Sequence, residues 1–143
     1  MDVLIRYAMS FVGLPYRWGG DDAINGFDCS GFVQEVLASV GMDPKGDQTA
    51  HGLYQHFKVS GGQRRVLMRG SLCFFGSSAT RITHVGFALD GWRMIEAGGG
   101  GSNTKTKDDA ARHNAYIRIR PVLSRSDLIE AILPPYETQE LFS

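Results

Sequence analysis

The stretch Gly26-Phe27-Asp28-Cys29-Ser30-Gly31-Phe32 joins a glycine-marked loop to an apolar run with helical spacing. After Phe32, apolar residues recur along one face of an amphipathic helix, at Val33, Val36, Leu37 and Val40. This pattern places Cys29 in or just before the first helical turn. Unpaired backbone N–H groups and the positive end of the helix dipole favour a thiolate there, so the stretch predicts a nucleophilic cysteine. The alternative is that Cys29 is an ordinary core cysteine.

The composition fits one compact domain with a real core, since the chain has 143 residues and 43% hydrophobic content. Fifteen basic and fifteen acidic residues cancel, so no net field recruits nucleic acid or an anionic membrane. Cys29 and Cys73 lie in different apolar contexts and are expected to be free thiols. No cofactor and no metal are expected, because the cysteines and histidines lack the paired spacing of a zinc site. These residues are Cys29, Cys73, His51, His56, His84 and His113.

The N-terminal segment shows no export signal. Residues Met1–Val12 mix apolar and polar residues as an amphipathic helix does, and lack the basic, apolar and cleavage regions of a signal peptide. No run approaches the roughly 18 apolar residues of a membrane-spanning helix. The chain is therefore expected to be soluble, to carry no signal peptide or transmembrane segment, and to be cytoplasmic when synthesised.

Periodicity predicts a mixed set of helices and strands. Helical spacing covers residues 2–11, 29–40, 47–57 and 126–133. Short apolar or alternating segments typical of strands cover residues 71–75, 84–89, 92–97 and 115–122. A turn is expected at Gly76-Ser77-Ser78, and Asp90-Gly91 predicts that the segments beside it form an antiparallel hairpin. Little order is expected after Pro134-Pro135.

The predicted hairpin brings a histidine and a carboxylate together. His84 lies at the outer end of one strand and Glu96 near the far end of its partner, so we expect the two to be close. A hypothetical site then has a Cys29 thiolate, His84 as general acid and base, and Glu96 holding the imidazole. The alternatives are a structural histidine and a Glu96 that is solvated or pairs with Arg118 or Arg120.

Four successive blocks of the chain resemble the NlpC/P60 cell-wall peptidases. They are Gly13-Leu14-Pro15-Tyr16-Arg17-Trp18-Gly19-Gly20, Gly26-Phe27-Asp28-Cys29-Ser30-Gly31-Phe32-Val33, Gly70-Ser71-Leu72-Cys73-Phe74-Phe75 and Ile82-Thr83-His84-Val85-Gly86-Phe87. The resemblance covers about residues 2–122 and implies an α+β, reduced papain-like fold. In that fold the cysteine-bearing helix packs on a central antiparallel β-sheet that carries the histidine. The catalytic domain would span residues 1–124, and residues 125–143 would form a C-terminal helix and a partly disordered tail.

The resemblance also implies an activity. Members of the family cleave peptidoglycan stem peptides or muropeptides, most often between D-glutamate and a diamino acid. Cys29 matches the nucleophile, His84 matches the base, and Tyr16 matches the tyrosine that borders the thiolate and helps to polarise the scissile carbonyl. The other candidates for oxyanion or substrate binding are Asp28, Ser30, Trp18 and His51.

Two positions depart from the family pattern. The third catalytic position is usually His, Asn or Gln, whereas Glu96 stands here, and a carboxylate is expected to raise the pKa of His84. Where the family usually has a Gly-Asp-Leu turn, this chain has Gly70-Ser71-Leu72. Cys73 stands where the family usually has an aliphatic residue, and Cys73 is expected to lie in the core. Two alternatives stay open: an inactive wall-binding or phage-tail structural module with the same fold, and an amidase or acyltransferase with the same Cys/His pair.

Delivery to the wall is a separate question, because a wall hydrolase must reach its substrate. Phage-encoded members of the family are carried in tails. Delivery by a phage tail or another carrier, with tail proteins as partners, is therefore a hypothesis.

Overall fold

A six-stranded antiparallel sheet with the strand order β3-β8-β4-β5-β6-β7 forms the centre of the structure. The structure is a computed structural model that describes residues 1–22 and 26–136. The strands are β3 (Gln63–Arg64), β4 (Leu72–Ser78), β5 (Arg81–Ala88), β6 (Arg93–Gly98), β7 (Tyr116–Pro121) and β8 (Leu128–Leu133). The predicted α+β class is confirmed.

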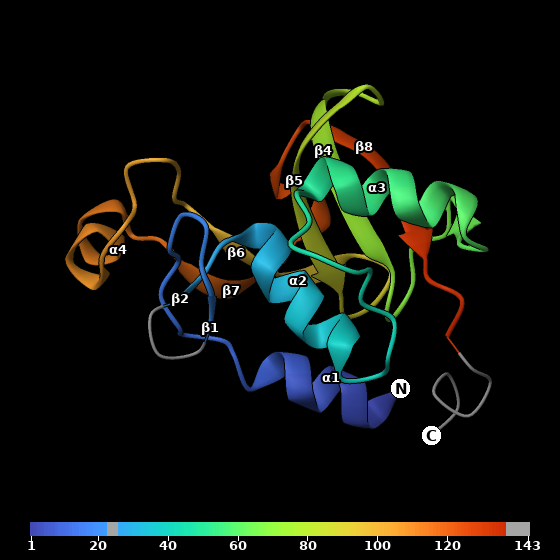
Figure 1. The fold of residues 1–143 in the computed structure, drawn as a ribbon, viewed down its shortest axis with the longest axis horizontal. Helices are drawn as coiled ribbons and strands as arrows, with labels where there is room; N and C mark the ends of the chain where they lie inside the picture. Colours follow the sequence, from blue (N-terminus) through green and yellow to red (C-terminus); the bar gives the residue numbers. More distant parts are fainter. Residues whose placement is uncertain (23–25, 137–143) are drawn as a thin grey trace.

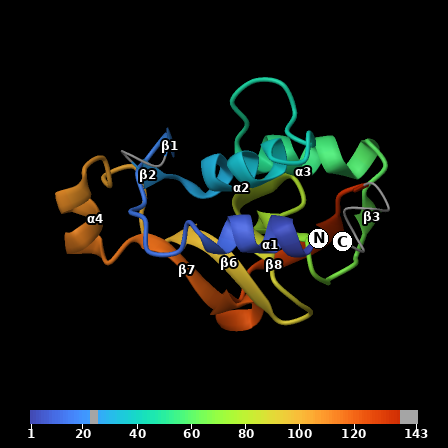
Figure 2. The ribbon, with the colours of Figure 1, turned by 90° about the horizontal axis from the view of Figure 1, so that it is seen from below.

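Three helices precede the sheet strands β4–β8 in the chain: α1 (Asp2–Met9), α2 (Cys29–Ala38) and α3 (Ala50–Val59). Both α2 and α3 pack against β5, and α1 packs against α2. Figure 2 shows α2 and α3 on one side of the sheet. The start of α2 is thereby held beside the central strands, where the predicted histidine lies.

The short elements β1 (Asp21–Asp22), β2 (Gly26–Phe27) and α4 (Lys107–His113) lie at one end of the molecule (Figure 1). A short hairpin pairs β1 (Asp21–Asp22) with β2 (Gly26–Phe27), and a 3-10 helix, η1 (Val122–Ser124), follows β7. Helix α4 (Lys107–His113) begins with a reciprocal cap in which Thr106 and Asp109 each accept the other's backbone N–H. No helix within the described residues is long and apolar enough to cross a membrane.

Side chains that alternate along the strands belong to two apolar clusters, one on each face of the sheet. In β4, Leu72 and Phe74 belong to the main core beneath the helices, whereas Cys73 and Phe75 belong to a smaller cluster on the other face. The smaller cluster is completed by Ala88, Met94 and Val122. The main core also contains fully buried helix residues such as Phe32 and Phe57. Truncating one such aromatic side chain to alanine typically costs about 3–5 kcal/mol.

Most of the predicted elements are confirmed. The three N-terminal helices occur with slightly different ends, and the strand expected over residues 115–122 is β7. The hairpin around Asp90-Gly91 is β5 and β6, which pair Phe87 with Ile95 and Ala88 with Met94. Helix α4 and the short strands β1, β2 and β3 were not expected.

Two predictions are wrong. Residues 126–133 do not form a helix, because Leu128–Leu133 is strand β8, which lies between β3 and β4. Gly76-Ser77-Ser78 is not a turn, because β4 continues to Ser78 with an irregular register beyond Phe75. The expected disordered tail falls largely on residues 137–143, outside the described part of the chain. Tyr136 is buried, and its hydroxyl donates to the Gly70 carbonyl at 2.7 Å.

Candidate active site

Cys29 is the first residue of α2, and the residues around it fix how the helix begins. Asp28 is the N-cap, in extended conformation, and its Oδ1 accepts the Gly31 N–H at 2.7 Å. Ser30 Oγ lies 3.3 Å from the same oxygen. Residue 31 has to be glycine, because a Cβ there would overlap the Gly20 carbonyl oxygen. The first turn of a helix leaves backbone N–H groups without intrahelical acceptors, so Cys29 stands where donors are available to an anion.

His84 and Glu96 form a buried pair on neighbouring strands. His84 Nε2 lies 2.8 Å from Glu96 Oε2, and the two residues are 7% and 1% exposed. This contact leaves Nδ1 as the ring nitrogen that can serve the thiol. Burial alone would lower the pKa of His84, but its interactions with Cys29 and Glu96 outweigh burial and raise it to about 9. The imidazole is therefore a strong base that is protonated at neutral pH.

The second carboxylate oxygen of Glu96 faces a cation. Glu96 Oε1 lies 3.5 Å from Arg120 Nη1, whereas Arg118 donates to the Asn114 carbonyl. Burial would raise the pKa of Glu96, but His84 and then Arg120 hold it below its usual value. Gly98 leaves room for this carboxylate, since a Cβ there would lie 2.7 Å from Oε1. Glu96 is thus a charged partner of His84 and is not a solvated strand residue.

Tyr16 borders the cysteine from the other side. It is 5% exposed, and its backbone bridges Phe27 just before α2. Burial raises the pKa of the Tyr16 hydroxyl, and the neighbouring charges of Cys29 and Asp28 raise it further. The ring packs against Gly100, where any Cβ would overlap ring carbons. Tyr16 is therefore held as a neutral donor beside the thiol.

Two hollows meet at the cysteine. The larger, of about 430 Å³, is lined by Tyr16, Trp18, Gly19, Asp28, Cys29, Ser30, Thr49, Ala50, Ile82 and Thr83. The smaller, of about 230 Å³, is lined by Tyr16, Trp18, Cys29, Thr83, His84, Ala97, Gly98, Gly99, Gly100, Gly101 and Arg125. Tyr16, Trp18, Cys29 and Thr83 line both, so the thiol stands where the two hollows adjoin.

The structure thus brings Tyr16, Trp18, Asp28, Cys29, Ser30 and His84 together around these hollows, with Glu96 bonded to His84 behind them. His51 is not among the described residues that line either one; its Nδ1 accepts the Ile82 N–H at 3.1 Å and ties α3 to β5. Cys73 is fully buried, and burial followed by the charge of Glu96 raises its pKa to about 12. It is a core thiol, as expected.

Sequence reasoning missed the glycine loop and Arg125 as parts of the site. The loop over residues 98–101 carried only the weak signal of four consecutive glycines. Arg125 fell in a segment assigned to a tail, so nothing local pointed to a cleft.

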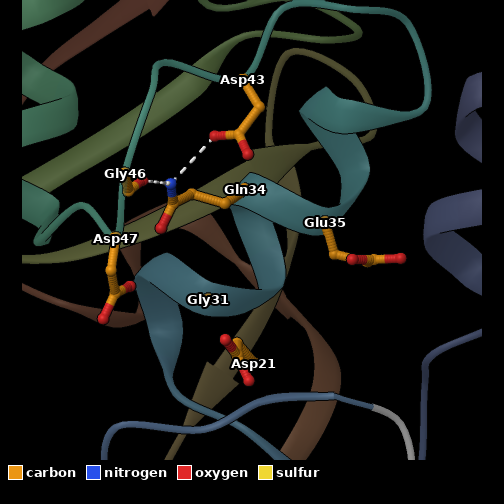
Figure 3. Close-up of a pocket in the computed structure, with 7 residues that line it drawn as sticks. All are labelled: Asp21, Gly31, Gln34, Glu35, Asp43, Gly46 and Asp47. Atoms are coloured by element: carbon orange, nitrogen blue, oxygen red, sulfur yellow. Dashed lines mark hydrogen bonds between the residues drawn. The ribbon is translucent and has the colours of Figure 1, made fainter.

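A third hollow, of about 220 Å³, lies beside α2 and is acidic (Figure 3). It is lined by Asp21, Gly31, Gln34, Glu35, Asp43, Gly46 and Asp47. Gln34 Nε2 donates to Asp43 Oδ1 and to the Gly46 carbonyl, both at 2.9 Å, and so holds the loop after α2. Within residues 1–22 and 26–136, no group of three or more His, Cys, Asp or Glu side chains could hold a metal ion.

A cysteine at a helix start, a histidine on the adjoining sheet and a carboxylate behind it form the constellation used in Cys/His nucleophilic catalysis. The NlpC/P60 family model matches residues 13–120. The chain belongs to the NlpC/P60 family.

Similar proteins agree with this assignment. The chain is 35% identical over 103 residues to the bifunctional muramidase/DL-endopeptidase CwlT of Bacillus subtilis, covering 70% of this chain and 30% of CwlT. It is 34% identical over 118 residues to the peptidoglycan endopeptidase RipA of Mycolicibacterium smegmatis, covering 73% of this chain and 22% of RipA. The chain therefore spans less than a third of either relative.

The fold is also found in solved structures. The NlpC/P60 domain of the peptidoglycan hydrolase SagA superposes with a TM-score of 0.65 at 26% identity, covering 92% of this chain and 96% of that domain. The predicted family fold, with the cysteine helix packed on an antiparallel sheet, is confirmed.

Proposed function

We propose that this chain is a cysteine endopeptidase that hydrolyses amide bonds in peptidoglycan stem peptides. The observation that carries the proposal is the buried 2.8 Å contact between His84 Nε2 and Glu96 Oε2. His84 lines the same hollow as Cys29. The names of relatives support the substrate, since RipA is named a peptidoglycan endopeptidase and MepH of Escherichia coli a murein DD-endopeptidase. We take the bond to be the one between D-glutamate and a diamino acid, which agrees with the DL-endopeptidase name of CwlT.

Acylation begins with the Cys29 thiolate. Its sulfur attacks the amide carbonyl carbon, an S–C bond forms, and the carbonyl oxygen becomes an oxyanion. The Cys29 backbone N–H at the start of α2 and the Tyr16 hydroxyl are the donors we assign to that oxyanion. His84, as imidazolium, donates its proton to the leaving nitrogen while the C–N bond breaks. The products of this half-reaction are a free amine and a thioester on Cys29.

Deacylation uses the same histidine in the opposite direction. Neutral His84 takes a proton from water, whose oxygen attacks the thioester carbonyl. The tetrahedral intermediate collapses with cleavage of the C–S bond and releases a carboxylic acid. His84 remains protonated beside the regenerated thiolate. Glu96 stabilises this imidazolium through its 2.8 Å contact and keeps the ring oriented in both steps.

We place the two halves of the substrate in the two hollows. The group that protonates the leaving amine must lie beside it, so the amine-side half belongs in the smaller hollow, which His84 lines. The acyl half then lies in the larger hollow, against Trp18, Asp28 and Ser30.

The test is digestion of purified muropeptides with the wild-type protein and with Cys29→Ala and Glu96→Gln, read by mass spectrometry. Wild type should release two fragments whose summed mass exceeds the substrate by one water. Cys29→Ala should release none while keeping the wild-type circular dichroism spectrum. Absence of fragments with the wild-type protein would sink the proposal, and transfer of the acyl group to an added amine would reveal an acyltransferase instead.

Delivery of the domain to the wall by a phage tail stays a prediction from the sequence. Its test is co-purification of the chain with assembled tail particles.

A further inference from the structure

Arg125 lies beside Cys29 and His84 but has no role in the acylation and deacylation steps proposed above. It follows η1, and it lines the same 230 Å³ hollow as Cys29 and His84. Its guanidinium carbon lies over the ring of Phe75, 5.0 Å from the centroid. Phe75 stands opposite His84 in the β4–β5 register, and their ring centroids are 5.6 Å apart. A fixed positive charge therefore stands next to the catalytic imidazole, on the same face of the sheet.

The Arg125 side chain is held in place by neighbours on its own segment and on β4. Its Nε donates to Asp127 Oδ1 at 2.9 Å and its Nη2 to Asp127 Oδ2 at 2.8 Å. Neither bond uses Nη1, and the side chain is 31% exposed. An arginine anchored on one side by a carboxylate and below by a ring loses little conformational entropy when it binds a second anion.

The half of the substrate that meets Arg125 follows from the position of His84. Because His84 must protonate the leaving amine, the residue that contributes this amine occupies the hollow that His84 and Arg125 share. In a stem peptide this residue is the diamino acid. Diaminopimelate carries a side-chain carboxylate, whereas lysine and amidated diaminopimelate do not.

We propose that Arg125 binds a carboxylate of the leaving-group residue and makes the site select diamino acids that bear a free side-chain carboxylate. Guanidinium groups recognise carboxylates through short, charge-assisted hydrogen bonds, which are stronger than bonds between neutral groups. The proposal rests on the proposed peptidase function for its substrate, but the position of the cation beside Cys29 can be tested without any peptidase activity.

The substrate test uses two peptides that differ at one group, L-Ala-γ-D-Glu-meso-diaminopimelate and the same peptide with a side-chain carboxamide. The ratio of their kcat/KM values should favour the carboxylate by about tenfold in wild type and fall towards one in Arg125→Gln. Arg125→Lys should retain part of the preference. Arg120→Gln is the matched control, since it removes a positive charge near Glu96 from a residue outside the hollow, and its ratio should stay near wild type. A merely structural role of Arg125 would slow both peptides equally and leave the ratio unchanged, which would overturn the proposal.

The second measurement compares alkylation of Cys29 by iodoacetate, which carries a carboxylate, and by neutral iodoacetamide. The iodoacetate-to-iodoacetamide rate ratio should fall by about two- to fivefold in Arg125→Gln and stay near wild type in Arg120→Gln. An unchanged ratio in Arg125→Gln would overturn the assignment of a carboxylate site. If the ratio falls but wild type cleaves neither peptide, the carboxylate site stands and the proposed peptidase function fails.

Discussion

Glu96 gives His84 a charged partner at a position where the family resemblance implies His, Asn or Gln. An amide can orient an imidazole, but it cannot stabilise the imidazolium by a full charge. The 2.8 Å contact with Glu96 is one of the interactions that raise the pKa of His84 to about 9. The consequence is an imidazole that stays protonated well above neutral pH.

Replacing Glu96 with glutamine should therefore move the pH profile. The basic limb of kcat/KM, which reports loss of the His84 proton in the free enzyme, should lie near pH 9 in wild type and shift to lower pH in Glu96→Gln. The measurement is a pH–rate profile, paired with NMR titration of His84. Glu35→Gln, which removes a carboxylate on α2 that accepts a bond from Tyr7, is the control and should leave the limb in place. A basic limb that does not move in Glu96→Gln would contradict the role given to this carboxylate.

Gly100 controls the position of Tyr16. A Cβ at residue 100 would overlap the Tyr16 ring, whereas a Cβ at Gly101 would meet no atom within 4 Å. We expect Gly100→Ala to displace the tyrosine and lower kcat by about 100-fold, the typical cost of an error of about 1 Å in the placement of a catalytic group. Tyr16→Phe should cost a similar factor or more by removing an oxyanion donor.

Gly101→Ala is the matched control for the glycine loop and should lose far less activity than Gly100→Ala, because its Cβ would not meet Tyr16. Equal losses in Gly100→Ala and Gly101→Ala would mean that the loop acts through its flexibility and not through contact with Tyr16.

The elements that were predictable from the sequence are those with local signals. The helical spacing after Cys29 and the turn dipeptide Asp90-Gly91 each specify an element without reference to distant residues, and α2 and the β5–β6 hairpin follow. The pairing of His84 with Glu96 follows in turn from that hairpin. The closeness of His84 and Glu96 and the place of Cys29 at the start of a helix were therefore predictable, and only the distances and burial required the structure.

Strand β8 lacks such a signal. Its apolar run, Leu128-Ile129-Glu130-Ala131-Ile132-Leu133, fits a helix or a buried strand equally well, and the decision depends on pairing with β3 and β4. Arg125 was missed for the same reason, because it precedes β8 and its place beside the hollow depends on how the chain returns to the sheet. Long-range pairing is the information that local periodicity does not contain.

Glu130 is the residue that anchors β8 to the helical layer. It is 8% exposed, accepts the Tyr54 hydroxyl of α3 at 2.9 Å, and pairs with Arg64 of β3 at 2.8 Å. Glu130→Ala should lower the free energy of unfolding by about 2 kcal/mol, because it leaves the buried Tyr54 hydroxyl without its acceptor. Arg64 is half exposed, so loss of its ion pair adds little.

Urea denaturation of Glu130→Ala, Tyr54→Phe and the double variant measures this anchor. Tyr54→Phe removes the hydroxyl donor, so no buried hydroxyl is left without an acceptor. It should lower the free energy of unfolding by about 1 kcal/mol. The two losses should then add up to more than the loss in the double variant, because the residues share one bond. Strict additivity would show that Glu130 does not link β8 to α3.

At the scale of the whole molecule, the charges of Cys29 and Glu96 couple the protonation of His84 to the stability of the fold. His84 is 7% exposed between the sheet and the start of α2, and it is protonated more readily in the folded chain than in the unfolded one. Its folded pKa of about 9 stands above the ordinary histidine pKa of 6.5. A group whose pKa is raised by folding stabilises the folded state fully below its unfolded pKa, and this contribution is lost as the pH rises through its folded pKa.

The stability that His84 contributes should therefore decline between pH 6.5 and about pH 9. The quantity to measure is the free energy of unfolding of wild type minus that of His84→Gln, from urea denaturation at intervals from pH 6 to pH 10. This difference should be largest near pH 6, fall by up to about 1.4 kcal/mol per pH unit inside the window, and level off above it. Repeating the comparison in a Glu96→Gln background should shrink the pH-dependent part, because Glu96 is one of the groups that raise the pKa of His84. A difference that grows towards pH 9 would have the wrong sign for a folded state that favours the imidazolium. It would mean that burial outweighs the Cys29 and Glu96 interactions and that the histidine rests neutral.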